Sequence, residues 1–166
     1  MTKKNSLDAL RTPAFPVETF GTGEVAQILD VPMWRLQKFL QGQRYDLSPT
    51  GQIGKGRGSR RLFTRMDIYR IAIAARLTQD GFAPTFVAEA VQQIDDEDFI
   101  DPMGYAVDSV FAFERREGRP APRVYPAKQP LKMGKPDSPY YVLDLSEIIH
   151  EVDGRIKTLK KQMPEG

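Results

Sequence analysis

The sequence contains no cysteine and a single histidine, His150, among its 166 residues. Without cysteine there can be no disulfide, no thiolate metal site and no cysteine nucleophile. One imidazole cannot form a histidine metal cluster, so we expect His150 to be an ordinary residue on a helix surface. No nucleophile–base pair or cofactor fingerprint stands out either. We therefore expect no metal, no cofactor and no enzymatic activity.

Long hydrophobic runs are also missing, since no apolar stretch approaches the ~18–20 residues that span a bilayer. The basic residues near Met1 are not followed by an apolar segment, so we expect no signal peptide. The composition is ordinary for a soluble globular protein, with 40% hydrophobic and 28% charged residues. We expect a cytoplasmic protein without a membrane partner.

Charge is distributed unevenly, although the formal net charge is only +2. Residues 33–76 contain ten basic and two acidic residues, a local charge of +8. Residues 77–100 contain six acidic and no basic residues, a local charge of −6. A concentrated basic segment attracts polyanions, whereas the alternative is a solvated basic face without a partner. The segregation favours one positive surface and a nucleic-acid partner.

Two short helices are expected near the start, over residues 21–29 and 32–41. Glu24 lies three residues after Gly21 and can cap a free backbone N–H at the first helix start. Asp30 marks a tight turn, and Pro32 suits the first turn of the second helix. Two short helices joined by about three residues are typical of a helix-turn-helix.

A glycine-rich segment at residues 48–60 follows, and its four glycines and one proline exclude a helix interior. Short strands at 45–48 and 61–63 would make it the tip of a β-hairpin. Its Gly54-x-Gly56-x-Gly58 pattern lacks the Lys-Ser/Thr ending of a phosphate-binding loop, which disfavours a nucleotide site.

Two more helices are expected after this hairpin. Thr64 and Asp67 form a capping box for a third helix, which ends at Gly81. Pro84 opens a fourth helix that continues to Ile94. An acidic run at residues 95–98 then closes the segment, and its spacing does not fit a Ca²⁺ loop.

Residues 103–145 carry strand-forming residues, and a last helix is expected at about 145–161 behind an Asp144 capping box. Six aromatic residues there could line an effector pocket or simply form core: Tyr105, Phe111, Phe113, Tyr125, Tyr140 and Tyr141. The last helix carries one apolar stripe, which could pack on its own domain or pair with a second copy. We assign dimerisation to this stripe: Ile148, Ile149, Val152, Ile156 and Leu159.

The ordered set of elements in residues 20–94 resembles the MerR-like winged helix-turn-helix family. The matching residues are Phe20-Gly21-Thr22-Gly23-Glu24-Val25-Ala26, Val31, Leu36, Ser59-Arg60-Arg61-Leu62-Phe63-Thr64, Asp67-Ile68 and Gly81-Phe82. The resemblance covers under half of the chain. It implies a winged helix-turn-helix followed by a dimerising helix, and the β-structure between the two is a departure of this chain. The predicted fold is mainly α with small β (α+β), with a winged helix-turn-helix followed by a small β-containing region and a C-terminal helix. We expect a flexible arm at 1–18, a DNA-binding domain at 19–96 and a dimerisation or effector region at 97–166.

The sequence also departs from this family. Members carry an arginine, two aromatics and an acid in the second helix, where this chain has Gln37-Lys38-Phe39-Leu40. The wing is longer, and Arg60 replaces an aromatic residue. The phosphate contacts of the second helix could therefore have moved to the wing, and the target sequence cannot be transferred from the family.

The second helix and the wing supply the residues expected to contact DNA. Arg35 and Gln37 can pair with base edges, and Lys38 is expected to touch phosphate. Arginines among glycines suit a wing that enters a minor groove. The full set is Trp34, Arg35, Gln37, Lys38, Arg44, Lys55, Arg57, Arg60 and Arg61.

These expectations favour a bacterial, nucleoid-associated transcriptional regulator that binds operator DNA as a homodimer, with a small-molecule or protein effector as a further partner. The alternative is an architectural protein that bends DNA for recombination or chromosome organisation, with the same wing and no effector. An effector that changes DNA affinity would favour the regulator, and strong bending without one would favour the alternative.

Overall fold

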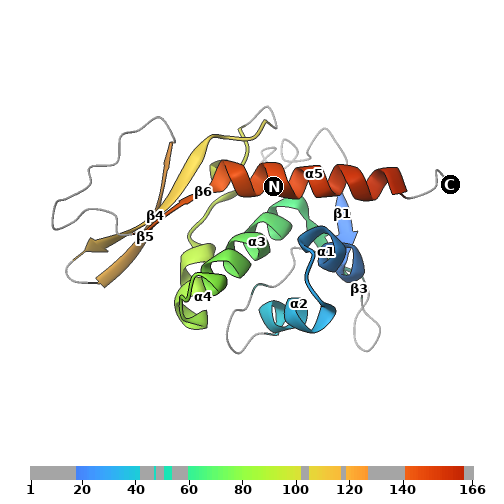
Figure 1. Cartoon of the computed structure of the whole chain (residues 1–166), viewed down its shortest axis with the longest axis horizontal. Helices are drawn as coiled ribbons and strands as arrows, with labels where there is room; N and C mark the ends of the chain where they lie inside the picture. The colour runs from blue at the N-terminus through green and yellow to red at the C-terminus, as the bar shows by residue number, and fades with distance from the viewer. Residues whose placement is uncertain are drawn as a thin grey trace, which may run out of the picture.

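The computed structural model describes residues 18–41, 47, 51–53, 60–101, 105–116, 119–126 and 141–162. Within these residues the chain forms five α-helices and two small antiparallel sheets (Figure 1). The expected α+β class is confirmed. The arm expected at 1–18 lies outside the described residues except for Glu18.

The first elements are the strand β1 (Thr19–Gly21) and the helices α1 (Thr22–Leu29) and α2 (Met33–Leu40). The backbone N–H of Gly21 donates to Oε2 of Glu24 over 2.6 Å, which is the cap that the sequence predicted. Asp30 adopts a left-handed conformation with φ of 52° and ends α1. Both predicted helices of the helix-turn-helix pattern are therefore present, within two residues of the expected bounds.

Two further strands, β2 (Gly51–Ile53) and β3 (Arg60–Thr64), join β1 in a sheet with the order β1-β3-β2. Phe20 pairs with Phe63, and Gln52 pairs with Arg61. The sequence predicted β3 but not β1. It also placed 51–53 in the hairpin tip, whereas these residues form β2. The strand expected at 45–48 lies outside the described residues except for Leu47.

Helices α3 (Arg65–Gln79) and α4 (Pro84–Gln92) follow as predicted. The Thr64 side chain accepts from Asp67 N, and the Asp67 carboxylate accepts from Thr64 N over 2.8 Å, which completes the expected capping box. Gly81 follows the end of α3 and has a φ of +94°. Residues with a Cβ atom adopt this conformation only with steric strain. A short 3₁₀ turn, η2 (Asp96–Asp98), occupies the acidic run.

The second sheet consists of β4 (Ser109–Arg116), β5 (Arg119–Pro126) and β6 (Tyr141–Asp144) in the order β5-β4-β6. The strand β5 has eight residues because it pairs along the whole of β4. Phe113 of β4 packs against Phe82 and Phe86, with ring centroids 4.9 and 4.7 Å apart. These contacts join the sheet to the start of α4.

The last helix, α5 (Leu145–Gln162), crosses the helices α1 and α3 along one side of the molecule (Figure 1). Its apolar stripe faces them, and each stripe residue is less than 10% exposed: Ile148, Ile149, Val152, Ile156 and Leu159. The assignment of this stripe to dimerisation is therefore wrong. The stripe packs inside the chain because α1 and α3 offer an apolar surface of their own, including Ile28 and Ile73.

One continuous core includes residues from both halves of the chain, from Phe20 to Leu159. The boundary expected at 96/97 does not separate two cores, because α5 buries its apolar side against the helices of the first half. The sheet β5-β4-β6 is the peripheral part, at one end of the molecule (Figure 1). The candidate site therefore rests on a scaffold to which the C-terminal helix contributes.

Candidate nucleic-acid interface

Helix α2 presents a polar outer side at one end of the molecule. Leu36, Phe39 and Leu40 are buried against the core, since their spacing places them on one helical stripe. The intervening positions point outward, so Gln37 and Lys38 are exposed. The buried apolar residues thus hold the helix on the core, and the polar residues on its outer side remain available to a partner.

Trp34 is 59% exposed on this outer side, and Met33 is 40% exposed. The ammonium of Lys38 lies 4.8 Å from the centroid of the Trp34 ring, one helical turn away. Met33 and Trp34 thus form a small exposed apolar patch beside a lysine, and exposed apolar patches bordered by polar residues can mark binding surfaces.

An open hollow of about 750 Å³ lies between α2 and the sheet β1-β3-β2. Gln37 and Gln41 line it from α2, and Arg61 lines it from β3. Thr19 and Thr22 contribute hydroxyl groups from the other side. Helix and strand thus share one concave surface whose rim carries hydrogen-bonding groups and a guanidinium.

Arg35 is separated from this hollow. Sequence analysis placed Arg35 with Gln37 as a reader of base edges, but the two lie on different flanks of α2. Gln37 lines the hollow beside β3, whereas Arg35 is half-buried and lines a second hollow beside α3 and α5. Two helical positions correspond to a rotation of about 200°, so the two side chains cannot reach one patch of a partner.

The other expected contact residues are only partly described. Arg44, Lys55 and Arg57 lie outside the described residues, and so does the side chain of Arg60, whose backbone forms the first residue of β3. Arg61 is exposed. The structure therefore brings Trp34, Gln37, Lys38 and Arg61 to one side of the molecule.

The described part of the basic segment does not form one continuous positive surface, because three of its arginines pair with acidic residues. Arg65 of α3 bonds Glu18 over 2.9 Å and lies 3.5 Å from Asp153. Arg70 bonds Asp96 and the carbonyl oxygen of Ile94.

Arg76 lies 3.7 Å from Asp80. Acidic residues from the segment before β1, the end of α3, η2 and α5 thus offset part of the positive charge of α3. Among the described residues, the predicted positive surface is therefore limited to α2 and β3.

A polar network holds α5 against α3 behind the candidate interface. Burial and a hydrogen bond to Asp153 raise the pKa of Tyr69, so its hydroxyl stays protonated and donates. Burial would raise the pKa of Glu18, but hydrogen bonds from Lys160 and Arg65 outweigh it and lower that pKa. The network joins the segment before β1 to α3 and α5, and it holds the sheet that carries Arg61.

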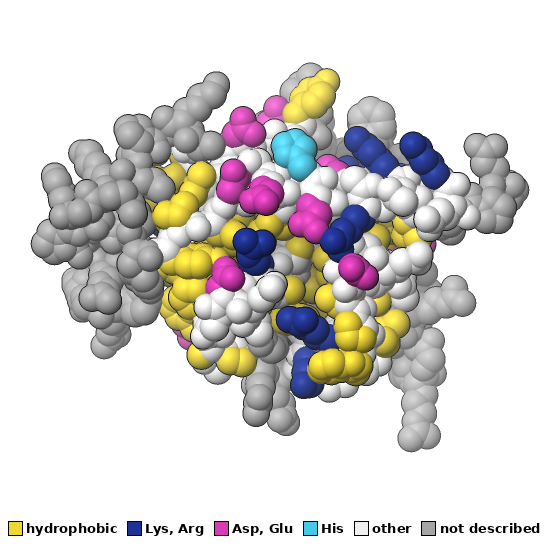
Figure 2. All heavy atoms as spheres, viewed as in Figure 1, with side chains coloured by type: hydrophobic (Ala, Val, Ile, Leu, Met, Phe, Trp, Pro, Cys, Tyr) yellow, Lys and Arg dark blue, Asp and Glu magenta, His cyan; other side chains and the backbone are white. Residues whose placement is uncertain are grey.

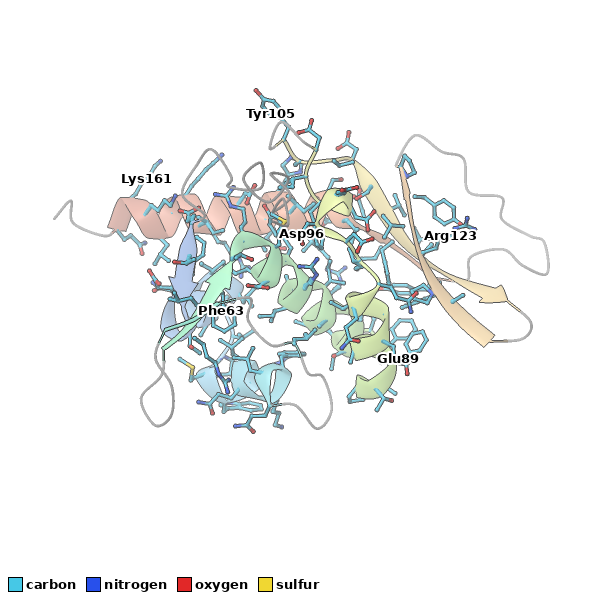
Figure 3. All side chains as sticks on the ribbon, turned by 180° about the vertical axis from the view of Figure 1, so that it is seen from behind. Phe63, Glu89, Asp96, Tyr105, Arg123 and Lys161 are labelled. Carbon is cyan, nitrogen blue, oxygen red and sulfur yellow. The ribbon has the colours of Figure 1, made fainter. Side chains whose placement is uncertain are left out.

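The aromatic residues weighed as an effector pocket are mainly structural. Phe111 and Phe113 are fully buried, and Tyr125 and Tyr141 are half-buried. Tyr141 donates a hydrogen bond to Asp80, and burial together with this bond raises its pKa. Tyr105 points away from the fold and is 70% exposed (Figure 3), while Tyr140 lies outside the described residues.

Sequence reasoning missed Thr19, Thr22 and Gln41 as lining residues of the hollow. Helical periodicity identifies apolar stripes, and these polar residues only meet because β1 pairs with β3 beside α2. His150 is exposed on α5, as expected.

Among the described residues, no cluster of three or more His, Cys, Asp or Glu side chains could hold a metal ion. The helices in the described part of the chain are too short or too polar to cross a bilayer. Neither a scan against models of known protein families nor a search of curated proteins found a match. The likeness to MerR-like proteins therefore depends on the residues quoted above.

Proposed function

We propose that this protein binds double-stranded DNA, with α2 in the major groove and the hairpin of β2 and β3 as a wing against the neighbouring minor groove. The observation that carries the proposal is the shared hollow, in which Gln37 of α2 and Arg61 of β3 line one open surface. A protein that reads DNA needs a helix for base edges and a second element for the backbone at a fixed distance.

The dimensions and chemistry of α2 support this role. An α-helix with side chains is about 10–12 Å wide and fits a major groove about 12 Å wide. Gln37 can pair bidentately with adenine, and the Trp34 ring offers apolar contact to a thymine methyl group. Lys38 is suited to phosphate. Gln41 and Thr22 can add neutral hydrogen bonds to the sugar-phosphate backbone within the same hollow.

The charge distribution supports the same side of the molecule. On the face shown in Figure 2, acidic side chains gather mainly along α5, whereas basic and hydrophobic side chains occupy the end formed by α2. Duplex DNA approaching α2 would therefore meet mainly neutral and basic side chains, and Glu24 is the one acidic residue among the described residues that line the hollow. Lys38 and Arg61 have no ion pair with another described residue, so both are available to a phosphate.

We further propose that the protein acts as a transcriptional regulator and binds a two-fold operator as a homodimer. The α5 stripe is buried in the chain, so the dimer interface has to use another surface. Footprint length on a natural site gives the number of protomers, because half-sites lie about one helical turn, 34–36 Å, apart.

Binding to duplex DNA tests the proposal directly. Genomic fragments captured by the full chain supply a natural site, and fluorescence anisotropy then measures affinity for that site across a salt series. We expect a linear decrease of log affinity with log salt. Lys38→Gln and Arg61→Gln should each reduce the slope of log affinity against log salt by about one, the value expected for the loss of one phosphate contact.

The matched control is Lys157→Gln, which removes an exposed cation from α5, away from the hollow. It should leave both affinity and salt dependence unchanged. The proposal fails if the chain does not bind duplex DNA, or if Lys157→Gln weakens binding as much as Lys38→Gln does. In the second case the attraction would be general and not located at α2.

A further inference from the structure

We propose that the second hollow, between α2, α3 and α5, binds a small organic carboxylate with an apolar body. This site is distinct from the proposed DNA-binding surface, since Arg35 is the one α2 residue that lines it. Three arginines from three helices meet there: Arg35 of α2, Arg76 of α3 and Arg155 of α5.

The floor of this hollow is apolar and its rim is charged, a combination typical of sites for small organic ions. Val31, Ala72 and Val152 are among the residues that line it, and Arg35, Arg76 and Arg155 provide the cations. Figure 2 shows basic side chains around a hydrophobic area in the middle of the face, between α5 and α2. An apolar body on the floor would place its headgroup among the guanidinium groups.

The arginines retain hydrogen-bonding capacity for a ligand. Arg155 donates from Nη1 to the carbonyl oxygen of Ile28 over 3.2 Å and from Nη2 to Glu151 over 2.6 Å, and these bonds hold it in place. A guanidinium has five N–H groups, so further donors remain. Arg35 has no hydrogen bond or ion pair with a described residue, and Arg76 lies 3.7 Å from Asp80, beyond a normal hydrogen bond.

Charge and size select the ligand class. Asp30 and Glu151 also line the hollow, and Asp80 lies 3.7 Å from Arg76, so the three arginines face three carboxylates. This balance of charge disfavours highly charged phosphates, whereas Arg35, which has no ion pair with a described residue, suits a single carboxylate. The volume of about 280 Å³ corresponds to about nine water molecules at ~30 Å³ each, which is enough room for an anion as large as benzoate or hexanoate. A planar carboxylate also matches the guanidinium fork.

Such a ligand would regulate the proposed DNA binding, and this part rests on the proposed function. Arg35 belongs to the same eight-residue helix as Gln37 and Lys38. A carboxylate held between Arg35 and Arg155 would fix α2 relative to α5. If the ligand changes the DNA affinity, DNA must change the ligand affinity by the same factor.

Titration with hexanoate and benzoate tests the ligand site without DNA, so its outcome does not depend on DNA binding. The readout is the NMR shift of arginine Nε–H groups in the full chain, with hexanamide and benzamide as neutral probes of equal shape. We expect saturable, localised shifts at Arg35, Arg76 and Arg155 with the acids and none with the amides. Arg35→Gln should weaken acid binding about tenfold, the loss of one charge-assisted hydrogen bond.

Lys38→Gln is the matched control, since it removes a cation from the same helix outside this hollow, and it should leave the shifts unchanged. Arg155→Lys tests the site with a cation of different geometry and should also weaken binding. The proposal is overturned if acids and amides shift the same groups equally. It is also overturned if no saturable shift occurs at millimolar acid, or if the shifts centre on Arg61.

Discussion

The hydroxyl of Tyr69, on α3, donates a hydrogen bond to Oδ1 of Asp153, on α5, over 2.6 Å. Tyr69 is 1% exposed, so this bond is made inside the interface that holds the C-terminal helix on the first half of the chain. Arg65 approaches the same carboxylate within 3.5 Å. The relationship makes α5 part of the scaffold of the candidate interface.

Removal of this hydroxyl should destabilise the fold. Tyr69→Phe keeps the ring but deprives a partly buried carboxylate of a donor, so the free energy of unfolding should decrease by about 1–3 kcal/mol. Urea denaturation followed by circular dichroism measures the change. Tyr105→Phe is the matched control, because Tyr105 is 70% exposed, and its effect should stay within about 0.5 kcal/mol. Equal effects of the two variants would contradict the structural role of the bond.

Truncation within the α5 stripe should cost stability and leave the oligomeric state unchanged. Ile156 is 1% exposed, so Ile156→Ala should lower the free energy of unfolding by about 2–5 kcal/mol. Analytical ultracentrifugation, at a temperature where the variant is folded, should give the same mass as for the parent chain. A variant that loses its partner but keeps its stability would restore the stripe to a dimer interface. Lys157→Ala, on the exposed side of the helix, should change neither property.

Stability should decrease in acid partly through Glu18. Its pKa is below the ordinary value in the folded chain, because hydrogen bonds from Lys160 and Arg65 outweigh burial. A carboxyl group with a lowered folded pKa stabilises the fold above its unfolded pKa, and this contribution is lost as the pH falls through the folded pKa. Urea denaturation between about pH 7 and pH 3 should therefore show a smaller decrease for Glu18→Gln than for the parent chain. The same pH dependence of the free energy of unfolding in both proteins would contradict this role of Glu18.

Trp34 is the only tryptophan in the chain and reports on α2. Because the ring is 59% exposed, acrylamide should quench its fluorescence efficiently in the free protein. Bound duplex DNA should shield the ring and reduce the quenching constant. Trp34→Ala should weaken DNA binding while changing the free energy of unfolding by no more than about 0.5 kcal/mol, as expected for an exposed residue. Unchanged quenching in a saturated complex would place α2 outside the contact.

Gln37 and Arg35 should differ in their effect on sequence discrimination. Gln37→Ala should reduce the preference for a natural site over random duplex by about 1–3 kcal/mol, since one bidentate base contact is lost. Arg35→Ala should leave this preference unchanged, because Arg35 lies on the flank that faces α5. Competition anisotropy with specific and random duplexes measures both. A loss of preference confined to Arg35→Ala would reverse the roles assigned to the two flanks.

Local rules were sufficient for most helices of this protein. The Gly21–Glu24 cap, the Thr64–Asp67 capping box and Pro84 mark helix starts through contacts within a few residues, and each was predicted from the sequence. The amphipathic stripe of α2 was predicted for the same reason, since helical periodicity alone places Leu36 inside and Lys38 outside. Short-range hydrogen bonds and periodicity need no knowledge of the rest of the fold.

The strands, the charge pairs and the partner of α5 were decided by the tertiary structure. β1 is a strand because it pairs with β3 some forty residues later. The positive charge of Arg70 is paired with the carboxylate of Asp96, which lies in the separate acidic segment 77–100. An apolar stripe on α5 specifies that it will be buried, but not against what. The contacts of Ile156 with the core form only when all the elements pack together. The same packing places Arg35 and Gln37 in different hollows.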